Sequence, residues 1–393
     1  MNNDPKTVSA SVKYAKPAIW HPVVDFLLVG GASIIGGIVL IVWFTNNPEW
    51  VSGFVWGPRK DNVENINRFW LFWYLALVIS YPHLLASYRI LYRSKAQIAK
   101  FRWSGIYVPC ILLAVCIVSL IALVVPAETS QDVRLQYASV LSTNSGLATY
   151  IFVGLSLINV VYLGWHYNLQ GWRMTATFAN VQGIQFSSRE QRMIKSGFLA
   201  MVLTHAVLLL AYSPYLDGEF FKKGFSTLTL WLPMVGGVAL ILGTLGFYSA
   251  YQRTGKRIPI NAITPWAASF FWYYIVMRWP AVLGIAVVVQ VAHALQYLSF
   301  TNRIERNLQL AKNPRANVFK PVLLMLVLIL CGYLVFEVPS QVVVKNNLSL
   351  HLLFAFQLLV LAVNIHHCFL DGEIWKQSNL EMQQTLLAHL EER

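Results

Sequence analysis

Charged residues are scarce in this chain of 393 residues: Asp, Glu, Lys and Arg make up 12% of it, whereas 56% is hydrophobic. A water-soluble domain carries about twice that fraction of charge, so the composition excludes a soluble globular protein. Disulfide-rich, collagen-like and disordered classes are excluded too, because the chain has only 4 Cys, 23 Gly and 16 Pro. The class that remains is an integral membrane protein that crosses the bilayer several times.

Several familiar motifs are also missing. No GxSxG, P-loop or HExxH motif occurs, so serine hydrolase, NTPase and zincin chemistry has no support. The cysteines form no CxxC pair and lie in apolar stretches, which predicts small buried side chains instead of a disulfide framework or a zinc ribbon. The first twenty residues are polar and no small-residue cleavage site follows them. We therefore expect the first apolar segment to be an uncleaved span.

Apolar segments long enough to cross a bilayer recur along the chain. A spanning helix needs about 20 mostly apolar residues, and the sequence predicts an all-α transmembrane helix bundle with about ten spans. The seventh is short, so a re-entrant segment is an open alternative. The expected spans are residues 24–44, 69–91, 105–125, 147–167, 197–213, 227–249, 264–278, 280–299, 321–338 and 350–370.

The basic residues predict the orientation of this bundle. If the N-terminus is cytoplasmic and the spans alternate, 22 of the 30 Lys and Arg residues fall in cytoplasmic segments, as the positive-inside rule requires. Both termini are then cytoplasmic, and the positive charge faces anionic lipid instead of nucleic acid. We expect a multi-pass protein of the bacterial inner membrane, with residues 1–376 as the bundle and residues 377–393 as a cytoplasmic amphipathic tail.

Histidines are the most informative polar residues of the predicted spans. Ionisable groups within a membrane are costly and usually functional. With the predicted orientation, six histidines from five different spans fall at one depth on the cytoplasmic side, whereas we interpret His205 and His351 as structural and His389 as solvated. The six are His21, His83, His166, His293, His366 and His367.

Most of these histidines have a polar partner one helical turn further on, and residues at i and i+4 share one face of a helix. A metal-bound imidazole usually donates its second N–H to such a partner. Asp371 is a candidate metal ligand, and Asp25, Gln170 and Tyr297 are candidate supporting residues. The pairs are His21/Asp25, His83/Ser87, His166/Gln170, His293/Tyr297 and His367/Asp371.

Several imidazoles and a carboxylate, without thiolates, suit iron, copper or zinc. Three or four histidines with Asp371 could hold one non-haem iron ion, and six could hold two. A site of this kind within the membrane predicts an oxidoreductase that uses dioxygen on an unactivated bond of an apolar lipid or isoprenoid. Membrane lipids and an electron-donor protein would be its further partners. We interpret Arg173, one to two turns beyond His166, as a snorkelling residue.

Two of these motifs are similar to motifs of a known group of membrane enzymes. Pro82-His83, and His367 followed by Asp371, resemble motifs of histidine-rich membrane non-haem iron oxygenases. The carotene-cleaving dioxygenases of the Brp/Blh type are more similar than the fatty-acid desaturases and hydroxylases, whose HxxxH and HxxHH boxes are absent. Ser87 stands where the first motif would have an acid. The resemblance implies an iron-dependent oxygenase that acts on an apolar lipid or isoprenoid, and it leaves the particular substrate open.

Other functions stay open. HHCFLDG is similar to the paired-histidine copper motif of haem–copper oxidase subunit I, but the His–Pro–Glu–Val–Tyr segment of that family is absent. A haem- or pigment-binding subunit of an electron-transfer complex is a stronger alternative, since two of these helices could clamp one porphyrin. A transporter lined by His and Asp is another, although the sequence has no repeated halves.

Overall fold

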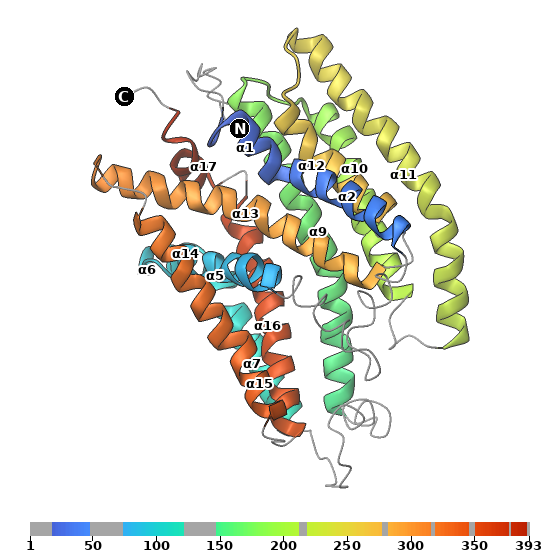
Figure 1. Ribbon diagram of the computed structural model, residues 1–393, viewed down its shortest axis with the longest axis vertical. Helices are drawn as coiled ribbons and strands as arrows, with labels where there is room; N and C mark the ends of the chain where they lie inside the picture. The colour runs from blue at the N-terminus through green and yellow to red at the C-terminus, as the bar shows by residue number, and fades with distance from the viewer. Residues whose placement is uncertain are drawn as a thin grey trace, which may run out of the picture.

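The computed structural model describes residues 18–47, 74–121, 147–211, 218–276, 282–315, 319–345, 350–376 and 379–390. In this part of the chain every regular element is helical and no strand occurs. Figure 1 shows the long helices packed side by side, with α13 running beside α2. The predicted all-helical fold class is therefore confirmed for the described residues.

The described elements comprise α-helices and five short π-helical segments, labelled η. Helix α10 packs against both α9 and α11, while α16 packs against α5, α7 and α9. The bounds are α1 Pro22–Phe26, η1 Leu27–Gly31, α2 Ala32–Asn46, η2 Ala76–Ser80, α5 Tyr81–Leu91, α6 Lys95–Lys100, η3 Trp103–Tyr107, α7 Val108–Ile121, α9 Leu147–Val181, α10 Ser188–Ala211, α11 Glu219–Thr254, α12 Ile260–Phe270, η4 Phe271–Val276, α13 Val282–Lys312, α14 Phe319–Gly332, η5 Tyr333–Glu337, α15 Val338–Lys345, α16 Leu350–Ile374 and α17 Leu380–Leu387.

Seven helical segments of the described residues are long and apolar enough to cross a membrane, which indicates a multi-pass membrane protein. They correspond to seven of the ten predicted spans. The other three, 69–91, 264–278 and 280–299, lie partly outside the described residues, and their described parts are helical. The count of ten, the re-entrant alternative and the cytoplasmic termini stay predictions. The seven segments are Pro22–Trp43, Trp103–Ile121, Tyr150–Val181, Ser188–Ala211, Glu219–Thr254, Phe319–Glu337 and Leu352–Ile374.

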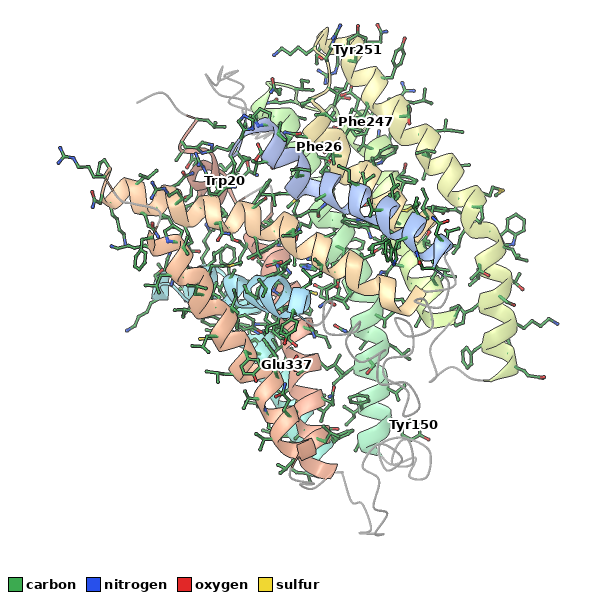
Figure 2. The ribbon with its side chains drawn as sticks, in the orientation of Figure 1. Trp20, Phe26, Tyr150, Phe247, Tyr251 and Glu337 are labelled. Carbon is green, nitrogen blue, oxygen red and sulfur yellow. The ribbon has the colours of Figure 1, made fainter. Side chains whose placement is uncertain are left out.

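Large apolar side chains cover the outside of the bundle. Val39 of α2 and Ile241 of α11 are 60% and 62% exposed, and many large exposed apolar side chains are typical of a surface that faces hydrocarbon. Figure 2 shows Tyr150 and Tyr251 at opposite ends of the bundle, where aromatic residues commonly lie at the membrane interfaces. Glu337, also labelled there, accepts a hydrogen bond from Tyr81 of α5.

The first transmembrane segment is kinked at Gly30, whose φ of 146° only glycine adopts readily. Gly30 also lies close against α12, because a Cβ there would be 2.7 Å from the Cβ of Ala268. At the kink, the carbonyl oxygen of Val29 accepts a hydrogen bond of 2.6 Å from the buried amide of Gln296 in α13. This bond satisfies a backbone group in the apolar interior and holds the kink against α13.

The C-terminal helix α17 is docked on the bundle, with Met382 and Leu386 buried. Asn307 of α13 donates to the carbonyl oxygens of Thr385 and Leu386. His389, which we expected to be solvated, is half-buried: its Nε2 donates to the carbonyl of Ala18, and its Nδ1 faces Asn307. The two ends of the described chain therefore lie together on one side of the bundle (Figure 1).

Candidate metal centre

Four buried histidines from four different helices meet in the interior of the bundle. Each is at most 6% exposed, and one ring nitrogen from each lies within 4.8 Å of those from the other three. His83 comes from α5, His166 from α9, His293 from α13 and His367 from α16. Among the described residues, this group has the composition and spacing of a metal-ion site.

The ring nitrogens face one another in two pairs. Nε2 of His83 lies 2.9 Å from Nε2 of His367, and Nε2 of His293 lies 2.9 Å from Nε2 of His166. Two imidazole lone pairs repel at this distance unless a proton or a cation lies between them. A single cation at the common centre would satisfy all four nitrogens at once, whereas protons would have to be shared separately within each pair.

Asp371 adds an oxygen to the four nitrogens. Its Oδ2 lies 3.4 Å from Nε2 of His367 and 3.6 Å from Nε2 of His166. The residue is 1% exposed, and Oδ2 makes no hydrogen bond to any described residue. A buried carboxylate oxygen without a donor is costly, and a metal ion would offset that cost. We name His83, His166, His293, His367 and Asp371 the five-donor centre.

Ser87 determines which nitrogen of His367 points at the centre. The fully buried Ser87 hydroxyl donates to Oδ1 of Asp371 at 2.6 Å, and a hydroxyl has only one hydrogen to donate. It must therefore accept from Nδ1 of His367, 3.0 Å away, and from the hydroxyl of Tyr297, 2.6 Å away. With Nδ1 protonated, Nε2 of His367 presents its lone pair to the centre, as a metal ligand requires.

Local sequence explains how α5 presents His83 and Ser87. Pro82 occupies the first turn of the helix, where its missing N–H is harmless. The π-helical turn η2 precedes it, and such turns shift the register of a helix, frequently at functional sites. Residues 83 and 87 are one turn apart, so both side chains lie on the inward face.

A second set of polar residues supports the ligand helices. Gln170 donates from its Nε2 to the backbone carbonyl of His293 at 3.2 Å. Arg173 donates to the carbonyl oxygens of Asp371 and Gly372 near the end of α16, at 3.0 and 3.3 Å. Its guanidinium thus braces the backbone of Asp371, a role that the interpretation as a snorkelling residue missed.

The structure separates the six histidines of the predicted layer. It brings His83, His166, His293 and His367 together with Asp371, and it places Gln170 and Tyr297 beside them. His366 lies outside the group, because its Nε2 donates to the carbonyl oxygen of Ser104 at 2.7 Å and its Nδ1 faces the hydroxyl of Tyr88 at 2.9 Å. Neighbouring residues of a helix point about 100° apart, so only one of the adjacent pair can reach the centre.

His21 and Asp25 are also separate from the group. His21 is exposed and caps the start of α1, where its Nδ1 accepts from the N–H of Val23. Asp25 accepts hydrogen bonds from the backbone N–H groups of Ile19 and Trp20. The i, i+4 pair therefore stabilises a helix start. His205, interpreted as structural, bonds to the hydroxyl of Tyr273 at 3.0 Å.

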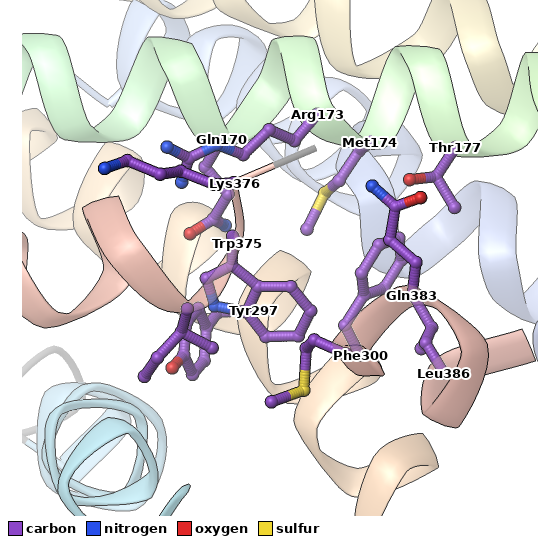
Figure 3. Close-up of a pocket in the computed structure, with 12 residues that line it drawn as sticks. Gln170, Arg173, Met174, Thr177, Tyr297, Phe300, Trp375, Lys376, Gln383 and Leu386 are labelled. Carbon is purple, nitrogen blue, oxygen red and sulfur yellow. The ribbon is translucent and has the colours of Figure 1, made fainter. Parts of the chain in front are cut away.

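A small cavity of about 30 Å³ lies next to the five-donor centre. Gln170, Tyr297 and Trp375 line it, and each follows a residue of the centre by one helical turn. Figure 3 shows these side chains together with Arg173 between α9, α13 and the end of α16. Trp375 was missed from the sequence, although its spacing of four from Asp371 puts both on one face. The cavity has room for about two water molecules.

No family model, curated protein or solved structure matches the chain. The resemblance to histidine-rich membrane oxygenases stays a prediction. The chemistry of the site is therefore inferred from its geometry, in which four buried imidazoles can hold a metal ion.

Proposed function

We propose that the five-donor centre binds one iron ion and that the protein is a membrane oxidoreductase of the oxygenase type, acting on an apolar lipid or isoprenoid. The observation that carries this proposal is the convergence of four Nε2 atoms and Asp371 Oδ2 from helices far apart in the sequence. Imidazole and carboxylate donors without a thiolate are the ligands of non-haem iron enzymes.

The number of donors supports iron over a four-coordinate zinc ion. Zinc sites in proteins have four ligands in most cases, whereas this centre offers four imidazoles and a carboxylate oxygen. Five donors on an ion with six positions would leave one position for dioxygen.

The packing of the rings argues against haem. The centroid distances from the His83 ring to the other three rings are 4.4, 4.9 and 6.2 Å, and those from His166 to His293 and His367 are 4.6 and 5.0 Å. A porphyrin lies between its two axial imidazoles and excludes other side chains from that plane. Four rings this close leave no space for the macrocycle, so we propose a non-haem ion.

The location of the centre indicates the substrate class. Its ligands are buried in a bundle whose outer surface is apolar, so an apolar molecule dissolved in the bilayer reaches it without crossing water. A dioxygenase would place both oxygen atoms in the product. A hydroxylase or desaturase would also need two electrons, and the partner would then be an electron-donor protein.

Metal analysis with an absorption spectrum tests the proposal. We expect about one iron ion per purified chain and no Soret band. His367→Gln should lose the metal, because it removes one ligand. His366→Gln is the matched control and should retain the metal. The side chain of His366 is next to that of His367 in the chain but lies outside the centre. Zinc or copper in place of iron, or a metal that survives His367→Gln, would contradict the proposal.

A further inference from the structure

Two tyrosines lie against the imidazole rings of the five-donor centre in the described part of the chain. The ring centroid of Tyr297 is 4.4 Å from that of His83 and 6.0 Å from that of His367. The ring centroid of Tyr167 is 4.4 Å from that of His293. Tyr297 is 1% exposed and Tyr167 is 8% exposed, so both phenols lie next to the proposed ion and away from bulk water.

The hydrogen bonds of the two phenols differ. The Tyr297 hydroxyl donates to Oγ of Ser87 at 2.6 Å, and Ser87 donates to Oδ1 of Asp371 at 2.6 Å. A phenol that loses an electron becomes a strong acid, and a buried positive charge is costly, so oxidation of a buried tyrosine requires a proton acceptor at its hydroxyl. Ser87 and Asp371 provide that acceptor for Tyr297, whereas the hydroxyl of Tyr167 bonds to none of the described residues.

Trp375 connects Tyr297 with the surface of the protein. Its indole packs against the Tyr297 ring at a centroid distance of 5.5 Å and an angle of 81°, and Figure 3 shows the two side chains together at the small cavity. Trp375 is partly buried and precedes the exposed Lys376, just beyond the end of α16. The indole therefore lies between a fully buried phenol and an exposed residue of the chain.

These contacts place three aromatic groups in series, namely the imidazole of His83, the phenol of Tyr297 and the indole of Trp375. Tyrosine and tryptophan lose one electron more readily than phenylalanine does, and electron tunnelling becomes steeply slower with distance. Two short steps through rings in contact are therefore faster than one long step from the surface to the buried centre. The ring of Phe300, 5.9 Å from that of Trp375, is much harder to oxidise, so the series ends at the indole.

From these observations we propose that Tyr297 is redox-active: it gives single electrons to the metal ion, and Trp375 replaces them from the surface. The inference rests on the proposed function, and it adds the route by which an electron-donor protein supplies the centre. In each step the O–H bond of Tyr297 breaks. The electron reduces an iron ion that dioxygen has oxidised, and the proton passes to Ser87 while the Ser87 proton passes to Oδ1 of Asp371.

The step leaves Tyr297 as a neutral phenoxyl radical and Asp371 with one additional proton. A one-electron reductant at the surface, such as a reduced iron–sulfur protein, then supplies an electron through Trp375. The proton returns from Asp371 through Ser87, and the O–H bond of Tyr297 forms again. One electron has then passed from the surface reductant to the iron ion, and the protein has its original bonds and protons.

Freeze-quench electron paramagnetic resonance tests the proposal. Purified full-length protein, loaded with Fe(II) under nitrogen, is mixed with hydrogen peroxide as the oxidant and frozen. We expect the signal of an organic radical, whose hyperfine pattern changes when the protein is made with ring-deuterated tyrosine. With a ring-fluorinated tyrosine in place of Tyr297, which retains the hydroxyl and its hydrogen bond, the fluorine nucleus should split the signal. A residue that only positions Ser87 would give neither change.

Three variants are compared under the same conditions. Tyr297→Phe should lose the tyrosine signal and retain the iron, because Ser87 still bonds to Asp371. Tyr167→Phe is the matched control, since this ring is equally close to the centre, and it should retain the signal. Trp375→Phe should retain the signal but slow its loss several-fold when ferrocyanide, a reductant too polar to enter the bundle, is added.

The iron content of the same samples separates this proposal from the previous one. A native protein with iron but without a Tyr297-dependent signal would overturn the inference and leave the proposed function standing. A signal that the fluorinated residue does not split would overturn it too, and an unchanged loss of the signal in Trp375→Phe would overturn the route through the indole. Absence of bound iron would instead refute the proposed function, and this inference would fall with it.

Discussion

The Nε2 atoms of His83 and His367 lie 2.9 Å apart, although the two residues are separated by 284 positions in the chain. Helices α5 and α16 pack against each other, and both side chains are directed to the same buried point. His166 and His293 repeat the relationship from α9 and α13. A cation shared by such facing nitrogens removes the repulsion between their lone pairs, so its binding would stabilise the folded protein.

Asp371→Asn should weaken metal binding by about tenfold to a hundredfold. The amide removes the negative charge and the oxygen that lies 3.4 and 3.6 Å from two of the imidazole nitrogens. The measurement is retention of the metal against a graded series of chelator concentrations. Glu373→Gln is the control, because Glu373 lies two residues away and pairs with the exposed Lys376. Equal retention by the two variants would remove Asp371 from the centre.

Ser87→Ala should also weaken metal binding, by about tenfold. It leaves Oδ1 of Asp371 and Nδ1 of His367 without their shared partner, so the ring is free to adopt the wrong tautomer. The same chelator series measures the effect. Ser104→Ala removes an equally buried hydroxyl that has no hydrogen-bond partner among the described residues, and it should bind metal as the native protein does.

Docking of the tail helix α17 should weaken in acid. Burial, followed by the nearby charge of Arg303, lowers the pKa of His389 below its ordinary value of 6.5. The docked state therefore binds fewer protons than the released state, and its stability falls as the pH drops below about 6.5. Above that pH the contribution is complete.

Limited proteolysis of the tail at pH 7.5 and at pH 5 would measure this release. We expect faster cleavage at the lower pH, because a charged His389 would place a second N–H against the amide of Asn307. His389→Gln carries no titrating group, so its cleavage rate should change far less between the two pH values. An equal acceleration in both proteins would assign the effect to other groups.

Gly30→Ala should lower the free energy of unfolding by about 1–3 kcal/mol. The backbone φ of 146° strains any residue with a Cβ, and the added methyl group would lie 2.7 Å from the Cβ of Ala268. Thermal unfolding in detergent measures the change. Gly36→Ala, six residues along the same segment, meets no such contact and should be neutral; an equal loss in both variants would contradict the role of the kink.

Much of the fold could be predicted from the sequence because the bilayer imposes it. Without water, a crossing segment must satisfy its own backbone hydrogen bonds, so runs of about 20 apolar residues form helices. Seven of the predicted spans are among the candidate spans of the described residues. The predicted spans at 69–91, 264–278 and 280–299 lie partly outside the described residues, so they stay predictions.

The histidine layer shows where sequence reasoning ends. Position along each predicted span gave the depth of each histidine in the membrane. Depth alone placed His21 and His366 in the same layer as the four histidines that meet in the structure. Rotation about each helix axis and the packing of α5, α9, α13 and α16 decided the rest: His367 faces inward and its neighbour His366 faces Ser104. Those rotations depend on contacts between helices hundreds of residues apart, which the periodicity of any single helix does not contain.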